Sequence, residues 1–150
     1  MPSQNFLETV KAVYITRETK LALKNLCRAH PDILLYGETF GHQCLKYGAG
    51  PNDFFFAAFD IMDQGRWLDY DEALEMAEGI AGFKWVPLVY AGPFHKELLL
   101  AEAEKNSLWP GCTSQKREGI VIRPRKERTD PSLGRLQLKM VSNRYLSGDK

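Results

Sequence analysis

Three short stretches decide the expected fold of this chain: LYGETFG at residues 35–41, REGIVIRP at residues 117–124 and LQLK at residues 136–139. Each places a charged side chain on or beside an apolar run of the kind that forms strands. These charged residues are Glu38, Glu118 and Lys139. A sheet built from such strands would carry two carboxylates and one ammonium group on its surface.

Two carboxylates and one ammonium group on the face of a sheet would suit a nucleotide and its metal ion. An ammonium group attracts phosphate oxygens, and carboxylate oxygens are ligands that Mg²⁺ prefers. The three stretches together therefore predict a nucleotide-binding cleft.

Length and composition set the class of protein. The 150 residues are 44% hydrophobic, which predicts one domain with a workable core. The first residues contain neither a basic region nor a long apolar run, so we expect a cytoplasmic protein without a targeting signal or membrane association. The cysteines are odd in number and form no CxxC pair, which predicts reduced thiols.

Charge is distributed unevenly along the chain. Residues 1–109 contain 10 basic and 15 acidic side chains, net −5, whereas residues 110–150 contain 10 and 4, net +6. The C-terminal part is therefore expected to face phosphate, and its basic run is predicted to bind a nucleic-acid backbone. The alternative is a solvated loop between two strands. This run contains Lys116, Arg117, Arg123, Arg125, Lys126 and Arg128.

The apolar pattern in the first half predicts alternating helices and strands. Helical spacing favours one or two helices over residues 4–28, followed by a strand at 33–36 that ends at Gly37-Glu38. A glycine- and proline-containing loop is expected over 42–53, and the aromatic run 54–62 predicts a strand buried on both faces.

The second half continues this alternation. Asp69 and Glu72 form a capping-box pattern ahead of an amphipathic helix over 73–80. An edge strand is expected at 85–90, a helix at 93–106, and strands at 119–123 and 136–141 joined by a basic loop. The expected class is α+β, with antiparallel-rich sheets flanked by helices.

Four motifs in order resemble those of one enzyme family. LYGETFG at 35–41, FAAFDI at 56–61, EGIVIRP at 118–124 and LKMVS at 138–142 are similar to motifs III, IIIa, IV and V of ATP-dependent RNA ligases. Any one of them alone is a weak signal, but four in order over residues 33–146 are specific. The resemblance implies a partial nucleotidyltransferase core over residues 1–150, of the ATP-grasp-like type shared by ligases and mRNA capping enzymes.

The resemblance also implies a reaction and its cofactors. RNA ligases of this type use ATP with Mg²⁺ or Mn²⁺ and join RNA 5′-phosphate and 3′-hydroxyl ends. A lysine takes AMP from ATP, the AMP moves to the RNA 5′-phosphate, and the 3′-hydroxyl then displaces it.

Site residues are carried over motif by motif. Glu38 is expected to accept a hydrogen bond from a ribose hydroxyl, and Phe59 to stack on the adenine. Glu118 is expected to bind the metal ion, and Lys139 the α-phosphate. A weaker expectation assigns contacts with RNA or phosphate to Arg117, Arg123, Arg125 and Lys126.

Most of these residues also have a structural interpretation. Glu38 can simply be solvated or ion-paired, and Phe59 can belong to the core with the neighbouring phenylalanines. Glu118, which lies between Arg117 and Gly119, can form a simple surface ion pair. Lys139 on an apolar strand is harder to explain in this way, because a buried lysine without a partner is uncommon.

Two departures from the family pattern leave the function open. No lysine in the sequence is followed by x-Asp-Gly, the motif of the nucleophile, and Val141 stands where a second motif V lysine is expected. One hypothesis is an N-terminally incomplete RNA ligase, inactive alone in self-adenylylation. A second is half of a split ligase whose lysine is supplied by a separate chain. A third is a non-catalytic module that binds nucleotide or RNA.

Overall fold

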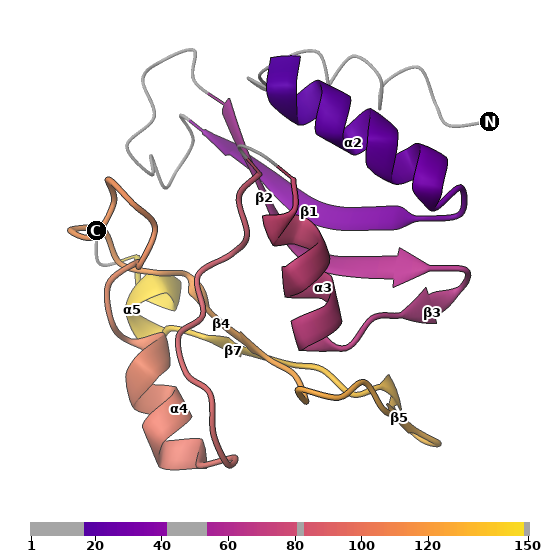
Figure 1. The fold of residues 1–150 in the computed structure, drawn as a ribbon. Coiled ribbons are helices and arrows are strands. Elements are labelled where there is room, and N and C mark those ends of the chain that lie inside the picture. The colour runs from indigo at the N-terminus through magenta and orange to yellow at the C-terminus, as the bar shows by residue number, and fades with distance from the viewer. Residues whose placement is uncertain (1–16, 42–53, 81–82, 149–150) are drawn as a thin grey trace. The chain divides into compact units, whose positions relative to one another are not determined.

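Helices and antiparallel strands form the regular structure of the described residues, which confirms the α+β class (Figure 1). The structure, a computed structural model, describes residues 17–41, 54–80 and 83–148. Contacts divide the chain into two compact units, an N-terminal unit up to Val86 and a C-terminal unit from Pro87. Among the described residues, no helix has the length and apolar character needed to cross a membrane.

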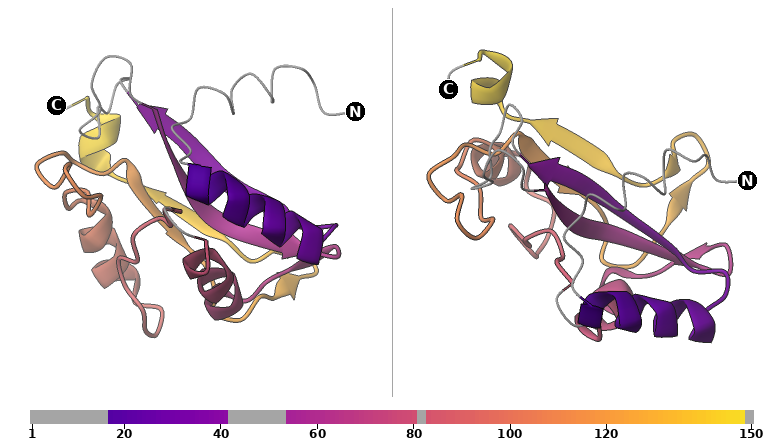
Figure 2. Two further views of the ribbon diagram at one scale, coloured as in Figure 1. Left: turned by 45° about the horizontal axis from the view of Figure 1, so that its top comes forward. Right: turned by 90° about the horizontal axis from the view of Figure 1, so that it is seen from above.

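The N-terminal unit is built on a three-stranded antiparallel sheet in the order β1-β2-β3, with helix α2 alongside it (Figure 2). The bounds are α2 Arg17–Ala29, β1 Leu34–Gly41, β2 Phe54–Asp63, β3 Arg66–Trp67 and α3 Tyr70–Glu78. The predicted helix over 4–28 is confirmed from Arg17, and its earlier part lies outside the described residues, as does the predicted loop over 42–53. The predicted strand over 54–62 is confirmed as β2.

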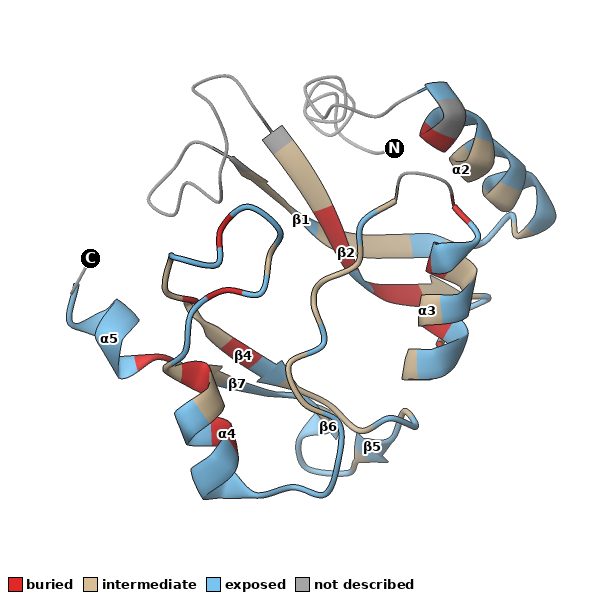
Figure 3. Ribbon diagram, turned by 60° about the vertical axis from the view of Figure 1, so that its left-hand side comes forward, coloured by how far each residue is buried: buried red, intermediate tan, exposed pale blue. Residues whose placement is uncertain are grey.

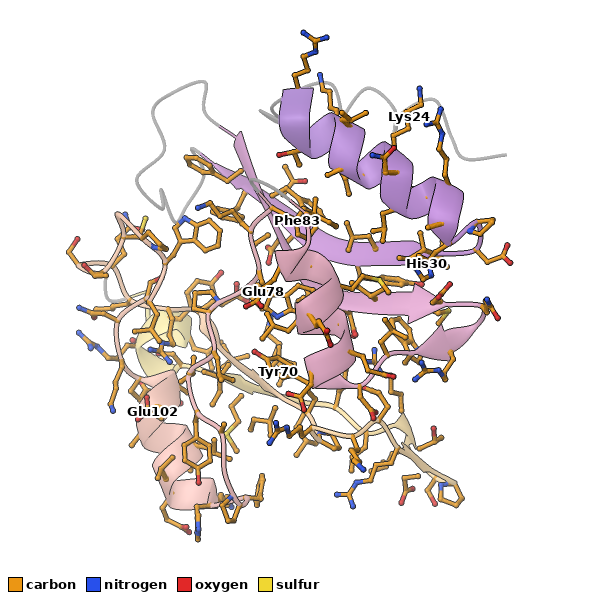
Figure 4. The ribbon with its side chains drawn as sticks, in the orientation of Figure 1. Lys24, His30, Tyr70, Glu78, Phe83 and Glu102 are labelled. Atoms are coloured by element: carbon orange, nitrogen blue, oxygen red, sulfur yellow. The ribbon has the colours of Figure 1, made fainter. Side chains whose placement is uncertain are left out.

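A small apolar core joins α3 to the sheet. It is formed by the buried side chains of Ile61, Leu68 and Ala73, with Trp85 packed against them. The capping box predicted from the sequence is present, because the backbone N–H of Asp69 donates to Glu72 Oε2 at 2.9 Å. Figure 4 shows side chains around α3, including Phe83, whose ring centroid lies 6.0 Å from that of Phe56.

Strand β1 differs from the prediction at its end. It continues to Gly41, so Gly37 and Glu38 lie inside the strand rather than at its terminus. The pairing with β2 shifts between Tyr36 and Gly37, which makes Phe59 the extra residue of a β-bulge. A Cβ on Gly37 would lie 2.6 Å from the carbonyl oxygen of Ala57. The glycine therefore permits a close approach of strands instead of ending one.

The strand predicted over 85–90 is wrong. One residue of it, Trp85, forms an isolated parallel bridge with Ala58. Two backbone hydrogen bonds of 2.9 Å support this bridge, from Ala58 N–H to Lys84 O and from Val86 N–H to Ala58 O. In the described part of the chain, the following residues to Tyr90 form no ladder.

The C-terminal unit packs helix α4 against the antiparallel pair β4–β7. The elements are α4 Lys96–Ala103, β4 Gly119–Ile122, β5 Thr129–Asp130, β6 Gly134–Arg135, β7 Leu138–Val141 and α5 Asn143–Leu146. The core contains Leu99, Ala103 and Ile120, whereas α5 is exposed (Figure 3). The predicted elements at 93–106, 119–123 and 136–141 are shorter than expected, and the expected basic loop contains the β5–β6 hairpin.

Replacing Gln64 by asparagine is expected to stabilise the protein. The turn between β2 and β3 places Gln64 at φ 50° and Gly65 at φ 77°, as a type I′ hairpin requires. Asparagine tolerates positive φ better than glutamine, so the free energy of unfolding should rise by about 0.5 kcal/mol. Urea unfolding measures the change, with Gln64→Val as a control that should lower stability. An asparagine variant less stable than the wild type would contradict this expectation.

Candidate functional site

Glu118 and Lys139, which are far apart in the sequence, meet at the surface of the C-terminal unit. Glu118 directly precedes β4, and Lys139 lies on β7 opposite Val121. Lys139 Nζ donates to Glu118 Oε1 at 2.7 Å, and the two side chains are 57% and 40% exposed. The structure therefore brings two of the predicted site residues together. The structural interpretation of Glu118 as a member of a surface ion pair is confirmed, with Lys139 as the partner.

Alternation along the strands explains why Lys139 is exposed on an otherwise apolar run. Ile120 and its cross-strand neighbour Met140 pack against α4. Val121, one residue after Ile120, and Lys139, one residue before Met140, face the other side, and Val121 is 63% exposed. The strand pair is therefore covered on one face and open on the other, and the open face carries the ammonium group.

Glu38 and Phe59 belong to the N-terminal unit. Glu38 is an exposed residue of β1 opposite Ala57, and Phe59 is the bulge residue of β2. Phe59 is 41% exposed, whereas Ala58 is 0% and Asp60 1% exposed. The bulge thus turns a large aromatic side chain toward solvent between buried neighbours. The interpretation of Phe59 as a core residue is wrong.

Arg117, the first of the four basic residues expected to contact RNA or phosphate, is buried. Arg117 is 7% exposed, and its guanidinium donates from Nε and Nη2 to the carbonyl oxygen of Asn106 at 3.0 and 2.8 Å. Burial lowers the pKa of Arg117, and the negative charge of Glu102, labelled on α4 in Figure 4, opposes this shift. The expectation that Arg117 presents its charge at the surface is wrong, because an internal carbonyl group binds that charge.

The remaining basic residues divide into two kinds. The side chain of Arg123 is 12% exposed, with Nε 4.0 Å from Glu127 Oε1. Glu127 also accepts two hydrogen bonds from Arg135, at 2.7 and 2.8 Å. Arg125 and Lys126 are exposed. Of the four basic residues named from the sequence, these two present their charge most directly to solvent.

Two polar residues near the Glu118–Lys139 contact were not found from the sequence. Glu104, which follows α4, accepts hydrogen bonds from Ser142 Oγ at 2.9 Å and from the Asn143 N–H at 2.7 Å. Ser142 is 1% exposed and is the N-cap of α5. A Ser-Asn pair is a helix-start signal that was available in the sequence. No local pattern joins Glu104 to a residue 38 positions later.

One carboxylate of this site suits a hard cation. Among residues 17–41, 54–80 and 83–148, no group of three or more His, Cys, Asp or Glu side chains could hold a metal ion. Mg²⁺ often binds proteins through one or two carboxylates and takes its other oxygens from water and substrate phosphates. Glu118, which is half-exposed and ion-paired with an exposed lysine, fits that mode of binding.

Comparison with known proteins gives one family match and several similar structures. A family model described as RNA ligase matches residues 2–141. A variant of the Naegleria gruberi RNA ligase with AMP and Mn has 25% identity and a TM-score of 0.68, over 90% of this chain and 39% of that one. The same ligase with PPi has 25% identity and a TM-score of 0.65, over 91% and 40%.

Another variant of that ligase, with ATP and Mn, has 24% identity and a TM-score of 0.67, over 90% of this chain and 39% of the other, which shows a shared fold. This chain therefore spans about two fifths of the length of the matched ligase chains. A search of curated proteins gave no match.

Proposed function

This chain belongs to the RNA ligase family, and we propose that it is a nucleotidyltransferase domain acting in the joining of RNA 5′-phosphate and 3′-hydroxyl ends. The observation that carries the proposal is the 2.7 Å contact between Glu118 and Lys139 on the open face of β4–β7. One group binds cations and the other binds phosphate, and both can reach solvent. Nucleotidyl transfer with a metal–nucleotide complex needs this pair of charges.

Lys139 is proposed to bind the α-phosphate of ATP. Its ammonium group would stabilise the negative charge that gathers on the phosphate oxygens during transfer. Glu118 is proposed to bind Mg²⁺ or Mn²⁺, which when bound neutralises charge on the phosphates. The structures of the Naegleria gruberi ligase with AMP or ATP and Mn support ATP and a divalent ion as cofactors.

Phe59 and Glu38 are proposed to recognise the nucleoside. An exposed aromatic ring can stack on adenine, and stacking on a base contributes about 1–3 kcal/mol. The exposed carboxylate of Glu38 can accept a hydrogen bond from a ribose hydroxyl. Their exposure supports these roles, because a core phenylalanine or a buried carboxylate would be unable to reach a ligand.

Arg125 and Lys126 are the proposed contacts to the RNA backbone. Both are exposed on the connection between β4 and β7. Arginine and lysine bind phosphates without regard to base sequence, and such binding weakens as the salt concentration rises. Arg123, whose side chain is largely buried beside Glu127, would contribute less.

The transfer of AMP begins with a lysine nucleophile. Its neutral Nζ attacks the α-phosphorus of ATP, and a P–N bond forms while the bond from that phosphorus to the α,β-bridging oxygen breaks. Pyrophosphate leaves with this oxygen, and the nitrogen releases a proton to solvent. This chain has no Lys-x-Asp-Gly motif, so we propose that the isolated chain does not form its own lysyl-AMP. The hypothesis of a separate chain that supplies the lysine has no support in the comparisons, and the non-catalytic nucleotide- or RNA-binding module is the alternative.

Replacing Lys139 by alanine is expected to weaken ATP binding about tenfold, since a charge-assisted hydrogen bond contributes about 1.5–3 kcal/mol. Isothermal titration with ATP and Mg²⁺ measures the dissociation constant. Lys126→Ala removes an exposed charge from the same unit and serves as the control, with little expected effect. Equal affinities of the wild type and the Lys139→Ala variant would contradict the assigned role.

Intact mass after incubation with ATP and Mg²⁺ then tests whether the isolated chain forms lysyl-AMP. We expect no AMP adduct on the isolated chain. An adduct that is lost in the Glu118→Ala variant would mean that another lysine is the nucleophile. ATP binding without an adduct would agree with the proposal, and absence of ATP binding would overturn it.

A further inference from the structure

Two buried polar residues flank the Glu118–Lys139 contact. Arg117 directly precedes Glu118, and Ser142 lies three positions after Lys139. They are 7% and 1% exposed, although arginine and serine are mostly found at protein surfaces. Buried polar groups require hydrogen-bond partners, and the partners of these two residues show what holds the site together.

Both residues bind to the same short segment, residues 104–106, which follows α4. The guanidinium of Arg117 donates twice to the carbonyl oxygen of Asn106, and its backbone N–H donates to the carbonyl oxygen of Lys105 at 3.3 Å. Ser142 Oγ donates to Glu104 Oε2 at 2.9 Å. The 104–106 segment therefore contacts the chain before β4 and the chain after β7.

The carboxylate of Glu104 makes the hydrogen bonds between the 104–106 segment and the chain after β7. Besides Ser142 Oγ, it accepts the backbone N–H groups of Asn143 at 2.7 Å and Arg144 at 3.3 Å. The hydrogen bond from Asn143, followed by those from Ser142 and Arg144, lowers the pKa of Glu104. These donors belong to the first turn of α5, where backbone N–H groups have no partner within the helix.

The two strand ends are also joined directly. The backbone N–H of Ser142 donates to the carbonyl oxygen of Glu118 at 2.8 Å. Ser142 thus binds Glu104 through its side chain and Glu118 through its backbone. A displacement of Ser142 would move the end of β7 relative to Glu118, and with it the ammonium group of Lys139.

We propose that Glu104 is a positioning residue, which fixes the end of β7 through Ser142 and so sets the distance between Lys139 and Glu118. This inference rests on the proposed function for its catalytic meaning. The core of the unit, formed by Leu99, Ala103 and Ile120, makes no use of the Glu104 carboxylate. Loss of that carboxylate should therefore displace Lys139 without unfolding the unit.

The first test measures the Lys139–Glu118 contact itself and needs no nucleotide. Acetylation by a small reagent requires approach to Nζ, and the 2.7 Å hydrogen bond to Glu118 Oε1 holds that atom against the carboxylate. Lys139 should therefore react faster in Glu104→Ala than in the wild type, by about threefold, because an exposed ion pair is weak. Mass spectrometry after a short pulse measures the rate, with exposed Lys126 as the internal reference.

Matched variants make the result decisive. Glu118→Ala gives the rate of Lys139 without its contact to the Glu118 carboxylate, and Ser142→Ala should raise the rate as Glu104→Ala does. Glu104→Gln, which keeps the side-chain shape, should fall between wild type and Glu104→Ala and decides the case if the alanine variant unfolds. An unchanged Lys139 rate in the folded Glu104 variants would overturn the proposal.

A double-mutant cycle on ATP affinity links the position of Lys139 to the proposed function. Glu104→Ala should weaken ATP binding in the wild type and have no further effect in the Lys139→Ala background. A purely structural role would instead give equal losses in both backgrounds, and equal losses would overturn positioning. If ATP does not bind at all, the proposed function fails, whereas the acetylation result still decides the role of Glu104.

Discussion

Replacing Gly119 by alanine is expected to separate β4 from β7 and to cost about 3 kcal/mol of folding free energy, at the upper end of the usual range for overpacking. A Cβ at this position would lie 2.1 Å from the carbonyl oxygen of Met140 and 2.9 Å from Cα of Val141. Both contacts are to backbone, so no side chain can rotate away to relieve them. The strands must therefore move apart, which displaces Glu118, directly before β4, from Lys139 on β7.

Urea unfolding and the acetylation rate of Lys139 together measure this effect. The stability of Gly119→Ala should fall, and Lys139 should react as it does in Glu118→Ala. Val121→Ala, on the same strand with a side chain 63% exposed, is the matched control and should change neither quantity much. A Gly119→Ala protein with wild-type stability would show that β4 and β7 can pair at a larger separation.

Arg117→Ala is expected to lower the free energy of unfolding by about 3 kcal/mol. The substitution removes two charge-assisted hydrogen bonds, leaves the carbonyl oxygen of Asn106 without them, and opens a cavity around a buried side chain. The affinity for RNA should stay close to that of the wild type, because Arg117 is buried and offers no exposed contact to phosphate. Thermal or urea unfolding measures the first quantity, and a filter-binding titration at several salt concentrations measures the second.

Arg125→Ala is the matched control for Arg117→Ala and should behave in the opposite way. Arg125 is exposed, so its removal should leave stability nearly unchanged while reducing the salt dependence of RNA binding by about one phosphate contact. Arg117 would have the surface role expected from the sequence if its alanine variant stayed stable and lost RNA affinity in the same way.

The different outcomes for these arginines show how far the sequence determines the site. The basic run is visible as a pattern of charge, but charge at the surface and charge inside have the same sequence signature. Arg117 became internal because the chain after α4 returns beside it and presents the carbonyl oxygen of Asn106, 11 residues earlier. Such a contact between segments has no local pattern.

Phe59 and Gly37 show, for the sheet, the same difference between what the local sequence predicts and what contacts between segments decide. The aromatic run correctly predicted a strand over 54–62, because aromatic residues favour strands. In a regular strand, side chains alternate between the two faces of the sheet, so the position of Phe59 in the strand would by itself assign its face. The shift in pairing at Gly37 decided its exposure, because one extra residue in a strand turns the following side chains to the other face.

The sequence by itself determined the α+β class, two strands predicted at 54–62 and 119–123, the capped helix after Asp69 and the family. These features depend on apolar spacing, capping residues and ordered motifs. Only the tertiary structure decided that Lys139 meets Glu118, that Arg117 is buried and that Glu104 holds Ser142. These contacts join residues 11 to 38 positions apart. Their existence depends on strand register and on where the chain returns, and local preferences encode neither.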